Sequence, residues 1–338
     1  MMHTKNLVVN LNIQYSKFMR IKKNVLFIYI FIFLASSIFS TTKWNFNISP
    51  YAGFSYNNLE EFFFSDIRTN EKISLLEWDA NPLWSLGLNF SASYKKIILD
   101  VDFAYSLPFC CGTMYDSDWD IFNGLKVIYS ESEIHNKNTL ATNLSFSYNL
   151  YEGTVFSLLP LINIDYRYFC FEARNGFGWY GTETKTHGEV AWNDPLAKYY
   201  APGQLNGLDF SKHSFELFTG VTIHSKIKKF NINCSALLSP FSYFYTMDIH
   251  LSKISNHHFE QIQYCQFQRF KINADLIYHI NKSISPFISA TFSWGYSAKG
   301  KLYSENPSSP SKKLYLMSQK SGSNQTIFSL KSGITVHI

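Results

Sequence analysis

The sequence has few cysteines and no apolar stretch long enough to cross a bilayer as a helix. The longest apolar run, Val25–Leu34, is shorter than the ~18 residues that a helical span requires. The five cysteines are odd in number, and the adjacent Cys110 and Cys111 cannot easily bridge each other. A helical membrane protein is therefore excluded, and a disulfide framework is disfavoured. The other three cysteines fall in runs of alternating polarity, where cysteine acts as a small apolar residue: Cys170, Cys234 and Cys265.

Residues 1–40 contain no Asp or Glu. They hold five Lys or Arg, three of them directly before Val25–Leu34, and small residues follow this run. Basic, apolar and small segments in this order predict a secretory signal peptide over residues 1–40, with cleavage near Ser37 or Ser40. No cysteine follows the apolar run closely, so a lipoprotein is disfavoured.

The remainder, residues 41–338, carries 25 basic and 25 acidic side chains and has no net charge. A nucleic-acid partner has no electrostatic support from this balance. We expect these residues to form one domain and to be monomeric.

Apolar and polar residues alternate with a period of two along several segments. The alternation is clearest in Trp84–Tyr94, Leu140–Leu150 and Phe328–Ile338. Such alternation is typical of strands. Aromatic residues make up 18% of the chain, with 31 Phe and 22 Tyr. Together with an export signal, these features favour a membrane β-barrel. Composition alone leaves a secreted β-sandwich open.

Short breaks and long polar segments alternate between the expected strands, as they do in outer-membrane barrels. This pattern predicts an all-β, ten-stranded antiparallel transmembrane barrel that extends above the outer membrane, with both termini on the periplasmic side. A barrel of ten strands is too narrow for an open porin-like channel. The expected long outer loops are 59–70, 110–138, 175–212, 248–258 and 299–313, and the strands begin near Trp44, Glu71, Ile97, Thr139, Thr154, His213, Phe230, Phe259, Ile284 and Leu314.

Asp116 and Asp118 form the first candidate pair, in an expected outer loop. In an extended chain, residues two apart point to the same side, so the two carboxyl groups would lie close together. Two close carboxylates cannot both ionise easily, which raises one pKa. On its own, such a pair is more often part of a turn or a solvated face.

Asp248 and His250 form the second candidate pair, in another expected outer loop. A carboxylate beside an imidazole can orient it and raise its basicity, as a general base requires. This pair is also weak evidence alone. The ten histidines are scattered, and no metal-ligand spacing or phosphate-binding loop is found, so neither a metal nor a cofactor is expected.

The two pairs occur together, in the second and fourth expected outer loops, and there the sequence resembles the omptin family. Met114–Trp119 is similar to the family's M-x-D-x-D-W segment, and Asp248–His250 is similar to its D-x-H pair. Leu76–Trp78 resembles its L-D-W segment. Tyr166–Gly176 resembles its R-Y-x-F-x-A-R-G-G segment, with one extra residue.

The resemblance implies an outer-membrane endopeptidase whose active site faces the extracellular side. Asp116 and Asp118 would position a water molecule and stabilise the oxyanion, while His250 acts as the base and Asp248 orients it. No acyl-enzyme or metal is implied. Family members cut polypeptides beside Lys or Arg, especially between two basic residues, using acidic residues of the cleft.

The cleft acids are only partly matched. Glu61 falls on the family's specificity glutamate, but Thr246 stands where an acidic companion is expected. A further acid would fall near Ser130, to which Glu131 is adjacent, so Glu131 is the candidate. These departures motivate an alternative function, a catalytically weak barrel that acts as an adhesin or binding protein. A structural or transport barrel would leave the two pairs unexplained.

The resemblance also implies binding of lipopolysaccharide phosphates by basic residues on the outer wall, and lipopolysaccharide is the candidate activator. Arg167 matches one of these basic residues, and Arg174 is a second candidate. An arginine whose head group reaches to the membrane rim without a specific ligand is the equally weighted alternative for Arg167.

Overall fold

The computed structural model describes residues 44–67, 71–184, 188–252, 256–305 and 314–338. The predicted signal peptide and its cleavage site lie outside these residues. Among the described residues, no helix is long and apolar enough to cross a membrane. Phe46–Ile338 form one compact unit.

This unit consists of antiparallel strands of unequal length. They are β1 (Asn45–Phe64), β2 (Lys72–Tyr94), β3 (Ile97–Ser106), β4 (Cys110–Trp119), β5 (Lys126–Asn136), β6 (Thr139–Tyr148), β7 (Tyr151–Glu152), β8 (Phe156–Tyr180), β9 (Lys198–Tyr200), β10 (Leu208–Ile227), β11 (Phe230–His250), β12 (His257–Cys265), β13 (Arg269–Tyr278), β14 (Ile284–Glu305) and β15 (Leu314–His337).

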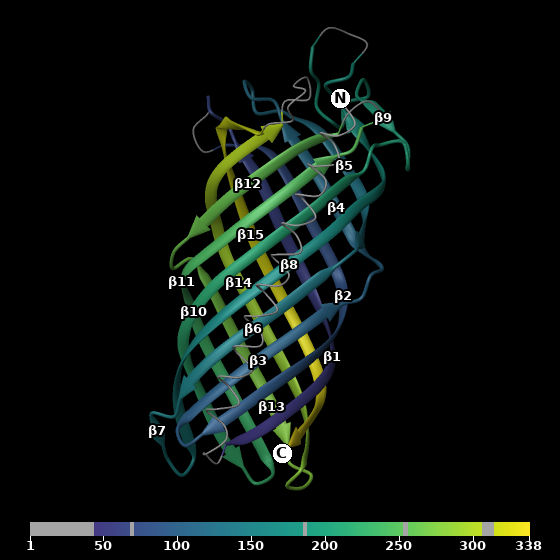
Figure 1. Ribbon diagram of the computed structural model, residues 1–338. Helices are drawn as coiled ribbons and strands as arrows, with labels where there is room; N and C mark the ends of the chain where they lie inside the picture. Colours follow the sequence, from purple (N-terminus) through teal and green to yellow (C-terminus); the bar gives the residue numbers. More distant parts are fainter. Residues whose placement is uncertain (1–43, 68–70, 185–187, 253–255, 306–313) are drawn as a thin grey trace, which may run out of the picture. The chain divides into compact units, whose positions relative to one another are not determined.

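The strands close into a barrel, because β1 pairs with both β15 and β2 (Figure 1). Three barrel strands are interrupted and each consists of two segments: β3 with β4, β5 with β6, and β12 with β13. The short β7 and β9 only add to β8. The described residues therefore form a ring of ten strands, which confirms the predicted fold. Backbone hydrogen bonds between Phe46 and Ile338 hold the two ends of the ring together at one rim.

The strands reach further than the sequence pattern predicted. Most of segment 110–138, expected to be a loop, forms β4 and β5, and only residues 120–125 separate them. The barrel strand expected to begin near Thr139 begins at Lys126. The physical reason is that a strand above the membrane has water, and not lipid, on its outer face. Apolar alternation is then lost, although backbone pairing continues.

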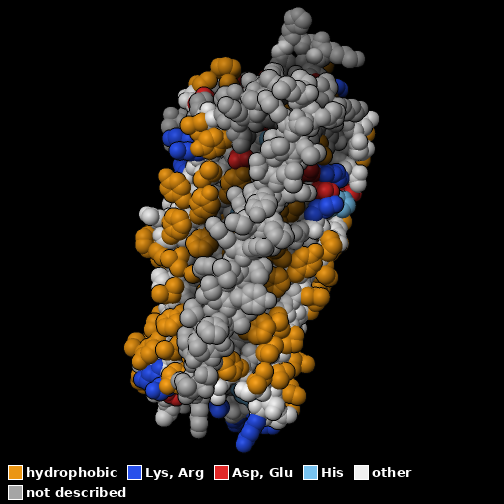
Figure 2. Space-filling view, viewed as in Figure 1, with side chains coloured by type: hydrophobic (Ala, Val, Ile, Leu, Met, Phe, Trp, Pro, Cys, Tyr) orange, Lys and Arg blue, Asp and Glu red, His pale blue; other side chains and the backbone are white. Residues whose placement is uncertain are grey.

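An apolar outer surface marks the membrane-spanning part of the barrel. On β10 its exposed apolar side chains lie between Phe215 and Ile227, and on β11 between Phe230 and Phe241. Figure 2 shows hydrophobic side chains over much of the visible outer wall, with charged groups toward its ends. The residues of β10 before Phe215 and of β11 after Phe241 therefore lie above this band.

The barrel interior is polar below and apolar above. The lower part holds a cavity of about 840 Å³ lined by polar side chains such as Asn143, Asp165 and Lys271. Above it, a buried group that we call the lumen cluster fills the barrel, with Trp78 stacked on Phe210 at a centroid distance of 4.5 Å. The lumen cluster consists of Leu59, Leu76, Trp78, Ala80, Leu83, Cys111, Met114, Ile134, Phe169, Phe171, Ala173, Leu208, Phe210 and Ile327. It closes the interior, as expected for so narrow a barrel.

Candidate active site

Asp116 and Asp118 lie on strand β4 and not in a loop. Asp116 is opposite Leu76 of β2, and Asp118 is opposite Ser74. Leu76 belongs to the lumen cluster, and so does Met114, two residues before Asp116. Strand alternation therefore places both carboxyl groups on the inner face, directly above the lumen cluster. The two residues are brought together as predicted, but by a strand.

The environment of this pair favours protonation. Burial raises the pKa of Asp116 well above its ordinary value, and the charge of Asp118 raises it further. Burial also raises the pKa of Asp118, although a hydrogen bond with Ser74 opposes this shift. Tyr180 lies near both acids and bonds to Ser130. Both shifts favour a proton on the pair.

Asp248 and His250 lie at the upper end of β11. Asp248 is opposite Phe210, and His250 is opposite Leu208, both members of the lumen cluster. Asp248 is fully buried, and its Oδ2 accepts a hydrogen bond of 3.2 Å from Gln261 Nε2. Among the described residues, no hydrogen bond joins Asp248 to His250. Asp248 therefore does not orient His250 in this structure.

His250 is a half-buried neutral base. Its ring meets the edge of the Phe259 ring at a centroid distance of 5.3 Å. Burial, with a smaller contribution from His257, lowers the pKa of His250 to about 4. The expectation that a neighbouring carboxylate raises the basicity of His250 is therefore wrong for this structure. The imidazole is nevertheless unprotonated at neutral pH and can accept a proton.

The two pairs lie on opposite walls of the same end of the barrel. In the ring, β5, β8 and β10 separate β4 from β11 in one direction, and five strands separate them in the other. The lumen cluster packs against both pairs, since Met114 precedes Asp116 by two residues on β4 and Phe210 is the cross-strand neighbour of Asp248. A polypeptide entering this mouth would pass between an acid pair and a histidine, above an apolar floor.

Glu61 lies beside Asp248. Gln261 Nε2 donates to both carboxyl groups, at 3.2 Å to Glu61 Oε2 and 3.2 Å to Asp248 Oδ2. Burial raises the pKa of both acids, and the proximity of Glu61 raises that of Asp248 further. The remaining oxygens, Glu61 Oε1 and Asp248 Oδ1, have no hydrogen-bond partner. A proton shared between the two acids would satisfy both.

Lys212 of β10 is the charged residue that sequence reasoning missed. It is 0% exposed, and its Nζ donates a hydrogen bond to Ser323 Oγ. Ser323 is the cross-strand neighbour of Glu61, and Thr246 is that of Lys212. Lys212 fell in the segment 175–212, which was interpreted as a loop. If the segment had been assigned to a strand, alternation would have placed Lys212 on the inward face and so indicated a buried charge.

Comparisons with known proteins identify the fold and the family. A model of the omptin family matches residues 42–337. The chain belongs to the omptin family. Its structure is similar to that of the outer membrane protease OmpT from Escherichia coli, with a TM-score of 0.76 and 14% identity, covering 88% of this chain and 99% of that chain. At this identity the likeness concerns the fold.

Other matches are weaker. The outer membrane protein OprG from Pseudomonas aeruginosa gives a TM-score of 0.34 at 11% identity, covering 87% of this chain and 95% of that chain. A value this low supports no further argument. No curated protein is similar enough in sequence to count as a match. The family and the fold together confirm an outer-membrane β-barrel of the omptin protease family.

Glu131, predicted as a substrate-binding residue of this omptin, does not face the cleft. Ser130 is opposite Asp116, whereas Glu131 is opposite Tyr115, on the other face of the sheet. Tyr129, two residues away on the same face, donates a hydrogen bond of 2.7 Å to Glu131 Oε1. This orientation does not support the predicted role, because adjacent strand residues point to opposite sides and only one of the two faces the cleft.

Arg167, predicted to bind lipopolysaccharide on the outer wall, points into the barrel. It pairs with Asp165 at 3.3 Å and lines the lower cavity. The extra residue in the resemblance explains the error, since an offset of one residue turns a strand side chain to the other face. Ala173 faces inward, so its neighbour Arg174 faces outward. The Arg174 guanidinium pairs with Glu172 at 3.4 Å and with Asp209. Arg174 is therefore on the outer wall, with its charge already balanced.

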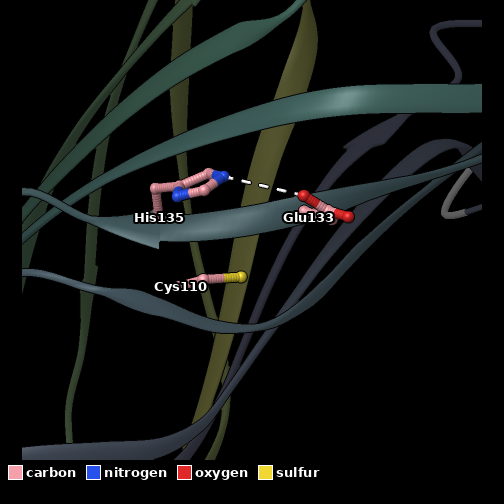
Figure 3. A group of neighbouring side chains, drawn as sticks. All are labelled: Cys110, Glu133 and His135. Atoms are coloured by element: carbon pink, nitrogen blue, oxygen red, sulfur yellow. Dashed lines mark ion pairs between the residues drawn. The ribbon is translucent and has the colours of Figure 1, made fainter. Parts of the chain in front are cut away.

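One group among the described residues has side chains that could together hold a metal ion: Cys110, Glu133 and His135. Figure 3 shows these side chains projecting toward one another from β4 and β5, with His135 and Glu133 joined as an ion pair of 3.8 Å. Cys110 and His135 are cross-strand neighbours, a proximity that sequence spacing does not reveal. The group contains none of the four predicted catalytic residues.

Proposed function

We propose that this omptin is an endopeptidase that hydrolyses polypeptides beside Lys or Arg at its extracellular mouth. The observation that supports this most is the position of the two pairs. Asp116 and Asp118 on one wall, and Asp248 and His250 on the opposite wall, share the inner face at one end of the barrel.

The chemistry follows from the protonation states. Neutral His250 takes a proton from a water molecule, and the resulting hydroxide attacks the carbonyl carbon of the peptide bond. Burial raises the pKa of Asp116 and Asp118 and so favours a proton on the pair, and this proton can be donated in a hydrogen bond to the developing oxyanion. The protonated His250 then gives its proton to the leaving amine. No covalent enzyme intermediate forms.

Asp248 takes part only after a rearrangement. It is held by Gln261 and lies beside Glu61, so it must turn toward His250 to stabilise the imidazolium that forms. Such tightening of catalytic contacts on substrate binding is common. A substrate that separates Asp248 from Glu61 would free Asp248 for this role.

Glu61 is the acid that would select a basic residue at the cut. It is buried beside Asp248, where little water screens its charge. Lipopolysaccharide is a proposed partner of the outer wall, with Arg174 as the remaining candidate contact.

The test is cleavage of quenched fluorescent peptides by the folded barrel, with and without lipopolysaccharide. Peptides with two basic residues, with one and with none are compared, and mass spectrometry locates the cut. Asp116→Asn is the matched inactive control. Cleavage beside basic residues that this variant lacks supports the proposal. Peptide binding without any cleavage would instead support the alternative, an adhesin or binding protein.

A further inference from the structure

Lys212 reaches across the barrel, directly below the candidate catalytic residues. Its backbone is on β10, yet its Nζ bonds to Ser323 of β15. In the ring, β11, β12 and β14 stand between these two strands. Thr246, its cross-strand neighbour, is two residues before Asp248 on the same face of β11. The Lys212 backbone therefore lies one layer below Asp248. Its ammonium group ends beside Ser323, the cross-strand neighbour of Glu61.

The positive charge of Lys212 is opposed mainly by two acids of the candidate site, Glu61 and Asp248. Four charged groups act on it: Glu61, Asp248, Glu216 and Arg269. Glu216 and Arg269 pair with each other at 2.9 Å and largely cancel. The remaining partners are Glu61 and Asp248. Lys212 Nζ also lies 5.3 Å from the centre of the Phe244 ring, and the Lys212 side chain is fully buried.

The position opposite Lys212 supplies no further acid. Thr246 is fully buried and carries no charge. A neutral residue therefore stands at the cross-strand position of Lys212, where the resemblance predicted an acid. The acid proposed to attract a basic side chain, Glu61, therefore already has a cation of the chain itself as its electrostatic neighbour.

We infer that Lys212 is a specificity-determining residue, which counterbalances Glu61 and so allows peptides with an uncharged residue at the cut. This inference rests on the proposed function. Glu61 still attracts Lys or Arg, but the internal ammonium reduces the gain, because an arriving cation meets a layer that is already balanced. Preference for a basic residue is consequently weak in this chain.

The test measures selectivity, which a purely structural role would not change. Two peptides that differ only by arginine or citrulline at the cut are compared by kcat/KM. In Lys212→Met, which keeps the length and removes the charge, the arginine-to-citrulline ratio should rise on the order of tenfold, as expected when one close, poorly screened charge is removed. Thr246→Asp, which adds an acid to the same layer, should raise the ratio as well.

The matched control is Lys271→Met. Lys271 is also buried and paired with an acid, Asp165 at 2.8 Å, but it lines the lower cavity. Its substitution should leave the ratio unchanged. Folding of each variant is verified by the gel-mobility shift on boiling. If Lys212→Met does not fold, Lys212→Gln, which removes the charge but keeps a hydrogen-bond donor for Ser323, decides the question: an unchanged ratio overturns the role of Lys212.

A second measurement separates this inference from the proposed function. Binding of the same two peptides is measured by fluorescence anisotropy in the Asp116→Asn background, with Lys212 or Met at position 212. Binding selectivity that rises with Met supports the inference even if no variant cleaves any peptide, an outcome that would reject the endopeptidase. An unchanged ratio in both cleavage and binding would overturn the role of Lys212.

Discussion

Protonation of His250 should occur near pH 4 and not near the ordinary histidine value of 6.5, because burial and His257 disfavour the imidazolium. The neutral base is present above this pKa and is lost as the pH falls through it. At pH 5.5, an ordinary histidine is only about 10% neutral, whereas one with a pKa of about 4 is roughly 97% neutral. His250 should therefore retain about ten times more of its basic form.

The assay is NMR titration of the histidine ring signals in the detergent-solubilised barrel, with His250→Ala to assign the signal. This readout isolates the imidazole, since the neighbouring acids Asp248 and Glu61 titrate as well. His257→Gln, which removes one cationic neighbour, should move the midpoint upward. A midpoint at or above 6.5 in the unaltered barrel would refute the argument from burial.

Three further outcomes are expected. Glu61→Gln should lower the preference for Lys or Arg and leave the barrel folded; unchanged proportions of cuts at basic and neutral sites would remove Glu61 from the pocket. Chelators should leave peptide cleavage unchanged, because the possible metal group of Cys110, Glu133 and His135 contains none of the proposed catalytic residues; a loss restored by added metal would contradict this. The outer-membrane fraction should contain a protein whose gel mobility shifts on boiling, as a closed barrel requires; recovery of a soluble protein without such a shift would be inconsistent with the fold.

The sequence pattern was most informative where the barrel meets lipid. There the outward residues must be apolar and the inward ones polar, so segments such as Trp84–Tyr94 show a clear period of two. The number of strands and the closure of the ring followed from these segments. Above the apolar band both faces accept polar residues, and β4 and β5 were therefore interpreted as a loop.

The sequence also predicted some residues of the candidate site better than others. Asp116, Asp118, Asp248 and His250 were found because spacing of two residues places side chains on one face whether the segment is a loop or a strand. Arg167 and Glu131 were misplaced because their prediction depended on register, in which an error of one residue reverses the face. Lys212 could not be placed at all, since its partner Ser323 is distant in sequence.

The direction of the pKa shift of His250 also could not be predicted from the sequence. A carboxylate two residues away suggests a raised pKa, but the structure directs Asp248 toward Gln261 and Glu61. Which neighbour a buried acid contacts depends on β1 and β12, whose residues lie far along the chain. Only the folded barrel decides between the two electrostatic outcomes.

The measurement that tests the central claim most directly is a double-mutant comparison across the mouth. Asp116→Asn and His250→Ala should each lower kcat/KM by roughly 10²–10⁴-fold in a verified folded barrel. The double variant should have nearly the same kcat/KM as the less active of the two single variants, because residues that act as one unit give strongly non-additive losses. Full activity in folded His250→Ala, or fully multiplied losses in the double variant, would contradict the proposed mechanism.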